Sequence, residues 1–172
     1  FLSPIMGAIA DRGGFRKVFL IFWTWICVVF SFMLYYPMPG DVFNALLFFC
    51  IANIGFEMGG VFLNAYLPEI APKDKIGRIS GYGWSFGYAG GLLALAVCFV
   101  FLVFPEQPIN PLTGNYFDKE SYEHIRIINV LIAVWLAIFS IPTFLFVKGS
   151  IKKNKEKKGI ISKSYLELIR TF

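Results

Sequence analysis

The stretch VFLIFWTWICVVFSFMLYY, residues 18–36, carries no charged side chain and decides the class of the fold. A transmembrane helix needs about 20 consecutive apolar residues to cross the hydrocarbon core of a bilayer. Three further stretches meet this requirement, residues 42–67, 79–104 and 127–147, and they contain a single charge, Glu57. The sequence therefore predicts an all-α, polytopic helical membrane protein.

The composition supports this class and argues against a soluble domain. Hydrophobic residues make up 57% of the chain and charged residues only 16%, with a mean hydropathy of +0.65, whereas soluble domains carry about 25% charged residues. The net charge of +5 does not form a basic groove with interleaved aromatics, so we expect no nucleic-acid partner. The three cysteines lie inside apolar stretches without metal-ligand spacing. We expect no metal and no cofactor.

The remaining segments complete the predicted organisation. Residues 1–10 are apolar but too short to span a bilayer, and the chain begins with Phe1. We expect this run to be the end of a truncated helix, so that residues 1–147 form a partial bundle of five spans. Residues 148–172 read as a basic cytoplasmic linker that ends in the start of a further helix.

The distribution of cations predicts the topology. Fourteen of the 16 lysines and arginines lie in three connections, residues 11–17, 68–78 and 148–172, and the other two lie in residues 105–126. Loops rich in Lys and Arg stay on the cytoplasmic side of a membrane. We therefore expect these three connections to be cytoplasmic, in a multi-pass protein of a bacterial inner membrane.

The first basic connection reads GAIADRGGFRK over residues 7–17. Gly7 allows a helix end to approach a neighbour closely, and Gly13 and Gly14 allow a tight reversal between two helices. Asp11 can pair with a cation or cap the next helix. These features suit a short loop at a membrane surface.

The same string resembles the loop signature of the major facilitator superfamily. The matching positions are Gly7, Asp11, Arg12, Gly14, Arg16 and Lys17. In that family the loop joins the second and third of twelve helices and works as a cytoplasmic gate latch. The resemblance implies that residues 1–147 belong to the N-terminal six-helix half of a major facilitator fold and that residues 148–172 are its central loop.

Three other strings resemble one branch of that superfamily, the vacuole-effluxer-like proteins related to autophagy permeases. They are Ser3-Pro4, NAYLPEI at residues 64–70, and GRISGYGWSFGYAGG at residues 77–91. Membership of this branch implies efflux of amino acids or of solutes not yet assigned.

Two functions from different classes fit such a scaffold. The first is secondary active transport of a small solute, by rocking of two halves around a site near the bilayer midplane, with a proton as the candidate coupling ion. Its partners would be the solute, the lipid bilayer and the remaining half of the same transporter. The alternative is a non-transporting receptor or scaffold, because a fold does not fix function.

Glu57 is the residue with the strongest chemical implication. It lies within a predicted span, and with Asn53 and Asn64 it follows helical spacing, so these polar side chains share one stripe. Polar residues in a span usually face the bundle interior or a water-filled cavity. The stripe is therefore a candidate site for substrate or a coupling proton. A carboxyl group that only links helices by hydrogen bonds is the competing interpretation.

The span at residues 79–104 is rich in glycine. Small residues at a spacing of three and four allow close helix packing, and we assign this role to Gly83, Gly87, Gly90 and Gly91. Trp84, Ser85 and Tyr88 are candidates for lining a solute cavity. The string partly resembles the superfamily's glycine–proline motif, but Tyr88 follows Gly87 where that motif has proline. The antiporter inference drawn from it does not apply.

Residues 83–87 also match the Gly-x-Ser-x-Gly pattern of a hydrolase nucleophile elbow. That pattern requires a turn between a strand and a helix, whereas Ser85 lies inside a predicted span. The sole histidine, His124, falls at the opposite end of its own span, roughly 20 Å away in depth. We therefore expect no catalytic residues and no enzyme activity.

Overall fold

The computed structural model describes residues 15–105, 109–110, 114–118 and 120–147. Within these residues the regular structure is helical: α2 (Arg16–Met33), α3 (Val42–Asn64), α4 (Leu67–Ile70), α5 (Ile76–Cys98), the π-helix η1 (Phe99–Val103) and α6 (Glu123–Phe146). The predicted all-α class is confirmed. The expected span at residues 1–10, the linker at 148–172 and the loop residues Gly7, Asp11, Arg12 and Gly14 lie outside the described residues.

Four helices of the described part are long and apolar enough to cross a membrane. They are Arg16–Met33, Val42–Ile70, Ile76–Val103 and Glu123–Phe146. Each overlaps one of the four stretches that the sequence predicts as spans. The largest difference is at α6, which begins at Glu123 because that residue and Arg126 are anchored to neighbouring segments by hydrogen bonds.

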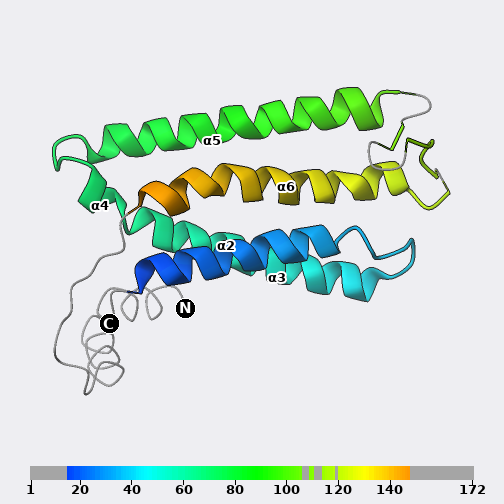
Figure 1. Cartoon of the computed structure of the whole chain (residues 1–172), viewed down its shortest axis with the longest axis horizontal. Helices are drawn as coiled ribbons and strands as arrows, with labels where there is room; N and C mark the ends of the chain where they lie inside the picture. The colour runs from blue at the N-terminus through cyan, green and yellow to red at the C-terminus, as the bar shows by residue number, and fades with distance from the viewer. Residues whose placement is uncertain (1–14, 106–108, 111–113, 119, 148–172) are drawn as a thin grey trace, which may run out of the picture.

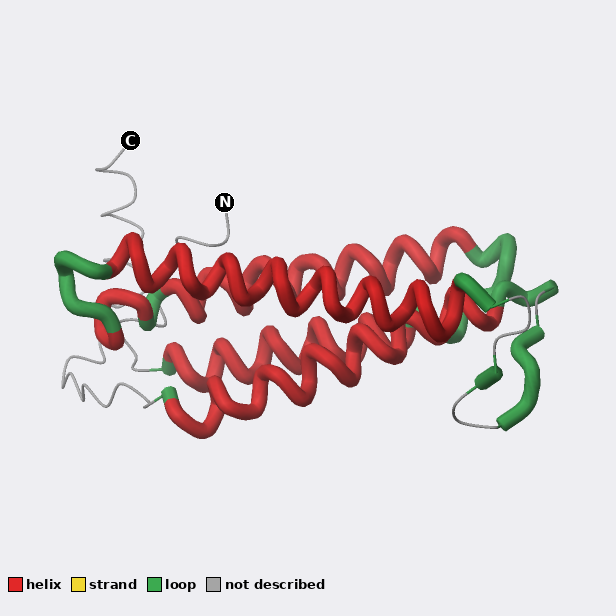
Figure 2. The backbone as a smooth tube through the Cα atoms, turned by 90° about the horizontal axis from the view of Figure 1, so that it is seen from above, coloured by secondary structure: helices red, strands yellow, loops and turns green. Residues whose placement is uncertain are grey.

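The four long helices run side by side along the length of the molecule (Figure 1). Helices α2 and α3 form an antiparallel hairpin, α6 lies against α2, and α5 follows α6 at the outside of the group (Figure 2). The turn between α2 and α3 includes Gly40 at φ +100°, a backbone conformation that side chains with a Cβ rarely adopt. We call the end that contains α4 the α4 end, and the end that contains residues 34–41 and 114–118 the loop end.

A hydrophobic cluster holds the bundle together at each end. At the α4 end, the buried cluster of Leu20, Met58, Phe62 and Tyr66 packs against Phe19 and Trp23 of α2, Phe144 of α6 and Val147, which follows α6. At the loop end, the cluster comprises Leu102 from η1, Phe117 from the loop, Ile127 from α6 and the partly buried Tyr35. These clusters connect α2 with α6 at both ends.

Helices α2 and α3 cross at a pair of glycines, Gly55 and Gly59. A Cβ atom added at Gly55 would lie 2.8 Å from the Cys27 backbone nitrogen and 3.0 Å from the Trp23 carbonyl oxygen. Such contacts exist only where two helix backbones approach closely, as in the Gly-x-x-x-Gly packing of membrane helices. The sequence interpretation had not singled out this seam.

The predicted packing glycines of α5 have a different environment. A Cβ at Gly83, Gly87, Gly90 or Gly91 meets no described atom within 4 Å. Their role in packing against a further helix stays a prediction.

Candidate functional site

The two faces of α3 have opposite character. Gly55 and Gly59 face α2, and at about 100° per residue Glu57 lies roughly 200° around the helix from Gly55. Asn53, Glu57 and Asn64 are all exposed in the described structure. The seam with α2 therefore orients the polar stripe away from α2.

Glu57 has no hydrogen bond or ion pair with any described residue. It lies in the third quarter of α3, well inside the span Val42–Ile70. An acidic side chain at such a depth costs roughly 2.5–3.5 kcal/mol on insertion scales if it faces lipid. The stripe is thus poorly suited to contact hydrocarbon.

The candidate residues of α5 lie on a separate surface. Trp84 and Tyr88 are 63% and 68% exposed, and their ring centroids lie 5.9 Å apart. No hydrogen bond or ring contact joins them to the stripe of α3 within the described residues. The structure therefore gives two exposed sets of candidate residues and does not bring them together.

Ser85 occupies a continuous helix. Its Oγ donates a hydrogen bond to the carbonyl oxygen of Gly81 at 2.9 Å, one turn earlier in α5. A nucleophile elbow instead places its serine at a sharp turn that follows a strand. Residues 83–87 therefore lack the strand–turn–helix geometry of a nucleophile elbow.

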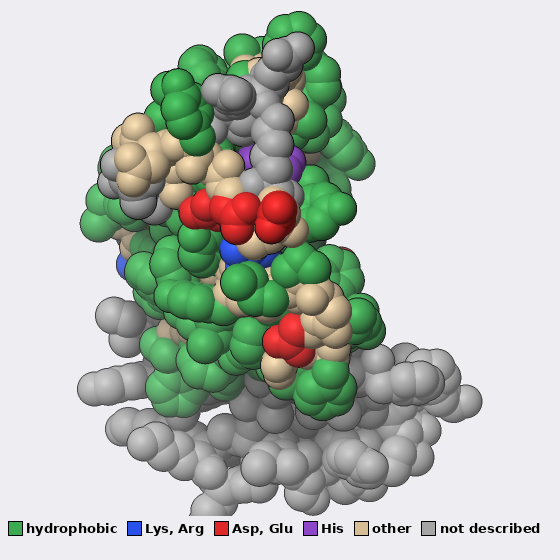
Figure 3. All heavy atoms as spheres, turned by 90° about the vertical axis from the view of Figure 1, so that its right-hand side faces the viewer, with side chains coloured by type: hydrophobic (Ala, Val, Ile, Leu, Met, Phe, Trp, Pro, Cys, Tyr) green, Lys and Arg blue, Asp and Glu red, His purple; other side chains and the backbone are tan. Residues whose placement is uncertain are grey.

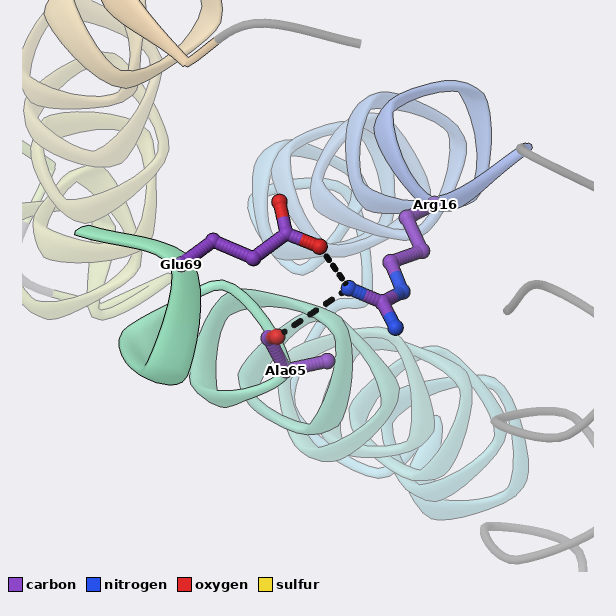
Figure 4. A network of polar contacts seen from close by, with 3 residues as sticks. All are labelled: Arg16, Ala65 and Glu69. Atoms are coloured by element: carbon purple, nitrogen blue, oxygen red, sulfur yellow. Dashed lines mark hydrogen bonds and ion pairs between the residues drawn. The ribbon is translucent and has the colours of Figure 1, made fainter. Parts of the chain in front are cut away.

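An ion pair fastens the start of α2 to α4. The guanidinium of Arg16 pairs with the carboxylate of Glu69 and also donates to the Ala65 carbonyl oxygen at 3.3 Å (Figure 4). Arg16 stands at a helix N-terminus, where the helix dipole disfavours a cation, and the carboxylate offsets this cost. Arg16 was predicted as a residue of the gate loop, and the structure shows that its partner is Glu69, which the sequence analysis did not include among the candidate site residues.

The position of Glu69 follows from local sequence. Pro68 is the second residue of the short helix α4, a first-turn position where a backbone N–H has no acceptor within the helix, and Tyr66, directly before α4, is only 2% exposed. Glu69 lies in the first turn of α4, where its carboxylate reaches Arg16 of α2. Lys17, next to Arg16 in the first turn of α2, makes no ion pair with the described residues.

A second polar network holds the loop end. Glu123 accepts hydrogen bonds from the Tyr35 hydroxyl at 3.2 Å, the Asn110 amide at 3.0 Å and the backbone N–H of Asp118 at 3.2 Å. Arg126 donates to the Tyr35 carbonyl oxygen at 3.0 Å, and its guanidinium carbon lies 5.2 Å from the centre of the Tyr35 ring. Acidic side chains gather on this end of the molecule (Figure 3). The network ties the loop to both α2 and α6.

Asp118 is the titratable group of this loop whose pKa is displaced. Hydrogen bonds from the Ser121 side chain and the Glu120 backbone N–H favour its charged form and lower the pKa of the carboxyl from its ordinary value. Because the side chain is fully exposed, this effect orders the loop locally and adds little to the stability of the bundle.

No group of three or more His, Cys, Asp and Glu side chains suited to a metal gathers among the described residues. The polar chemistry of this part of the chain thus consists of the stripe on α3, the ion pair at the α4 end and the network at the loop end.

Comparison with known proteins relates this chain to a family of transporters. The whole chain, residues 1–172, matches the model of a family described as vacuole effluxer Atg22-like. It is 26% identical over 161 residues to an uncharacterized MFS-type transporter, YxiO of Bacillus subtilis (strain 168), a match that covers 94% of this chain and 36% of the relative.

A second relative is an uncharacterized protein of Aquifex aeolicus (strain VF5). It is 34% identical over 96 residues, which cover 55% of this chain and 24% of that protein. The chain therefore spans about a third of the length of the first relative and a quarter of the second. No solved structure matches the chain.

Proposed function

The chain belongs to the vacuole effluxer Atg22-like family, and we propose that the protein carries a small solute across a membrane by alternating access. The observation that most supports this proposal is the position of Glu57. It lies on the exposed face of a helix long and apolar enough to span a membrane, opposite the seam where this helix packs against α2. In such transporters the substrate and ion sites lie near the bilayer midplane, between helix groups that move relative to one another.

The stripe of α3 supplies the chemistry for a solute site. Asn53 and Asn64 can each donate and accept hydrogen bonds, and Glu57 can hold a cation or exchange a proton. The seam at Gly55 and Gly59 supports this role because it presents the stripe on a firmly packed helix pair. A site on a rigid element keeps its geometry while the surrounding halves move.

The ion pair between Arg16 and Glu69 has the properties of a gate contact. The Glu69 side chain is 44% exposed, and such exposed pairs contribute only about 0–1 kcal/mol. A contact of this strength can break and re-form in each transport cycle. With the α4 end on the cytoplasmic side, as the positive charges of residues 11–17 and 68–78 suggest, this gate would close the cytoplasmic entrance.

Flux measurement tests this function directly. The full-length parent protein is reconstituted into proteoliposomes, and uptake is measured under an imposed proton gradient, with amino acids screened first because the family resemblance implies them. Glu57→Gln keeps the size of the side chain but removes its charge. Glu120→Gln, in the exposed loop, is the matched control.

We expect gradient-driven flux that Glu57→Gln abolishes and Glu120→Gln leaves unchanged, with both variants inserted and folded. Flux that persists in Glu57→Gln would show that Glu57 serves only in helix packing, and the proposal of a transporter would still hold. A folded wild type without flux for any solute would favour the receptor or scaffold on the same fold.

A further inference from the structure

The last part of the span that begins with α5 is not an α-helix. Directly after Cys98 the chain continues as the π-helix η1, and the backbone N–H of Phe104 donates to the carbonyl oxygen of Phe99, five positions earlier, at 2.7 Å. π-Helices are rare, occur mostly as single turns inside α-helices and are frequent at functional sites. The stretch FVFLV of η1 contains neither proline nor glycine, which are common local causes of an irregular helix. Its local sequence therefore does not explain the π-helix.

Packing at the loop end keeps η1 in the π conformation. Leu102 is only 5% exposed and lies in the cluster with Phe117 and Ile127. The rings of Phe99 and Phe104 lie across the π turn, with their centroids 5.9 Å apart. In an α-helix the neighbouring side chains are three and four positions apart, so a contact between side chains five positions apart depends on the π turn. The π-helix and its tertiary contacts thus support each other.

The π-helix also sets the rotation of α5 about its own axis. A π turn closes on the fifth residue, where an α turn closes on the fourth, so it contains one additional residue. If the turn becomes α-helical while Leu102 stays in its cluster, the preceding α5 rotates by about one residue, or roughly 100°. Each residue of α5 then takes the angular position that the residue before it held. Trp84 moves to the position of Gly83, and Tyr88 makes the equivalent move one turn later.

Two attachments hold α5 within the described residues, one at each end. Cys98, its last residue, is the only residue of α5 that the described part of the bundle buries, and η1 anchors that end. At the other end, residues 71–75 connect α5 to α4 by a compact turn, in which the Lys75 N–H donates to the Pro72 carbonyl oxygen at 2.9 Å. Glu69 of the gate pair belongs to α4. A displacement of Glu69 is therefore transmitted to the start of α5 over a short link.

We propose that η1 is a rotational switch of α5, which converts between π-helix and α-helix as the pair of Arg16 and Glu69 closes and opens. With the pair formed, η1 is a π-helix. With the pair broken, η1 is α-helical, and the ring of Trp84 occupies the position that Gly83 holds in the structure. The conversion exchanges a glycine for an aromatic ring and narrows the space along that face of α5. This inference rests on the gate contact of the proposed function, and the role of Glu57 does not enter it.

Electron paramagnetic resonance tests the switch in the full-length protein in lipid vesicles. Single cysteines that carry a nitroxide are placed at each position of residues 81–88, in a background whose native cysteines are replaced by alanine. The accessibility of each nitroxide to molecular oxygen is measured. Accessibility along a packed helix oscillates with a period of about 3.6 residues, so its phase reports the rotation of α5. We expect the phase to shift by one residue, about 100°, between the protein with the intact pair and Glu69→Ala.

Deletion of Val100 supplies the decisive variant. It removes the additional residue of the π turn, so that η1 forms an α-helix with both of its ends in register. The phase should then no longer respond to Glu69→Ala. Val100 is 55% exposed, and Val100→Ala, which keeps the number of residues, is the matched control and should retain the shift.

Two results would overturn the switch. One is an unchanged phase in Glu69→Ala, a comparison that holds even if the deletion variant does not fold, because it uses substitutions alone. The other is a phase shift that persists without Val100, which would show that α5 rotates without the π-helix. Flux in proteoliposomes separates this inference from the proposed function. A phase shift without flux of any solute supports the switch and contradicts the transporter, whereas flux with a constant phase supports the transporter and contradicts the switch.

Discussion

The backbone of α3 at Gly55 lies so close to α2 at Cys27 that an added Cβ would stand 2.8 Å from the Cys27 nitrogen. This contact places the polar stripe of α3 on the far side from α2. Because Gly59 lies one turn further along the same seam, the two helices form a unit whose geometry depends on the absence of side chains at these positions.

The first prediction concerns this seam. Gly55→Ala forces the added methyl group against the backbone of α2, and overpacking of this kind costs about 1–3 kcal/mol. The measurement is the thermal stability of the purified full-length protein in detergent, followed by size-exclusion chromatography. Gly60→Ala is the control, because a Cβ at Gly60 meets no described atom within 4 Å. Equal loss of stability in both variants would refute a special role for Gly55.

The four spans could be predicted from the sequence, whereas the contact between α2 and α3 at Gly55 could not. The length and apolar character of residues 18–36, 42–67, 79–104 and 127–147 predict the four spans, since a helix satisfies every backbone hydrogen bond inside a bilayer. The family resemblance drawn from residues 7–17 and 64–91 is confirmed by the match over the whole chain. Spacing alone could not show which glycines lie at a contact between two helices, because both α3 and α5 carry glycines one turn apart. Only the structure identifies which of them meets a neighbouring backbone.

The polar contacts at the two ends of the bundle could not be predicted from the sequence. Tyr35 and Glu123 are separated by 88 positions and Arg16 and Glu69 by 53, and no local pattern pairs residues over such distances. A hint existed for the second pair, since an acidic residue in a short basic connection often has a cationic partner. The stripe containing Glu57 could be proposed from helical periodicity, but its solute role rests on segments that the described residues do not include.

The second prediction concerns the ion pair at the α4 end. Exchanging the charges with Arg16→Glu and Glu69→Arg in one protein should restore much of the solute flux that either single change removes. Stability should change by about 1 kcal/mol or less in each variant, because the pair is partly exposed. A double-mutant cycle on flux in proteoliposomes measures the coupling. Additive effects of the two single changes would show that the contact has no part in gating.

The third prediction concerns the loop end. Glu123→Ala removes the acceptor of hydrogen bonds from Tyr35, Asn110 and the Asp118 backbone, and each such bond contributes about 0.5–1.5 kcal/mol to stability. We expect faster proteolysis within residues 105–122, monitored by mass spectrometry of the cleavage products. Glu120→Ala changes a neighbouring acid whose side chain is exposed and serves as the control. Identical cleavage of the two variants would exclude an anchoring role for Glu123.

The fourth prediction asks whether the stripe faces water in the assembled protein. Cys50 is exposed and, at about 100° per residue, lies within roughly 20° of Glu57 around α3, whereas Cys27 is buried beneath the seam. Thiols react with maleimides as thiolates, which form in water and not in hydrocarbon. A water-soluble maleimide should therefore label a variant that keeps only Cys50, and should not label one that keeps only Cys27.

A cysteine placed at Ile138, on the exposed apolar face of α6, completes that experiment. The same reagent should leave it unmodified, because a side chain in contact with lipid hydrocarbon has no access to aqueous maleimide. Labelling is measured by the mass shift of the intact protein in native membranes. If Cys50 and the cysteine at position 138 react alike, the stripe has no privileged access to water, and Glu57 must be satisfied by another helix instead of a solute pathway.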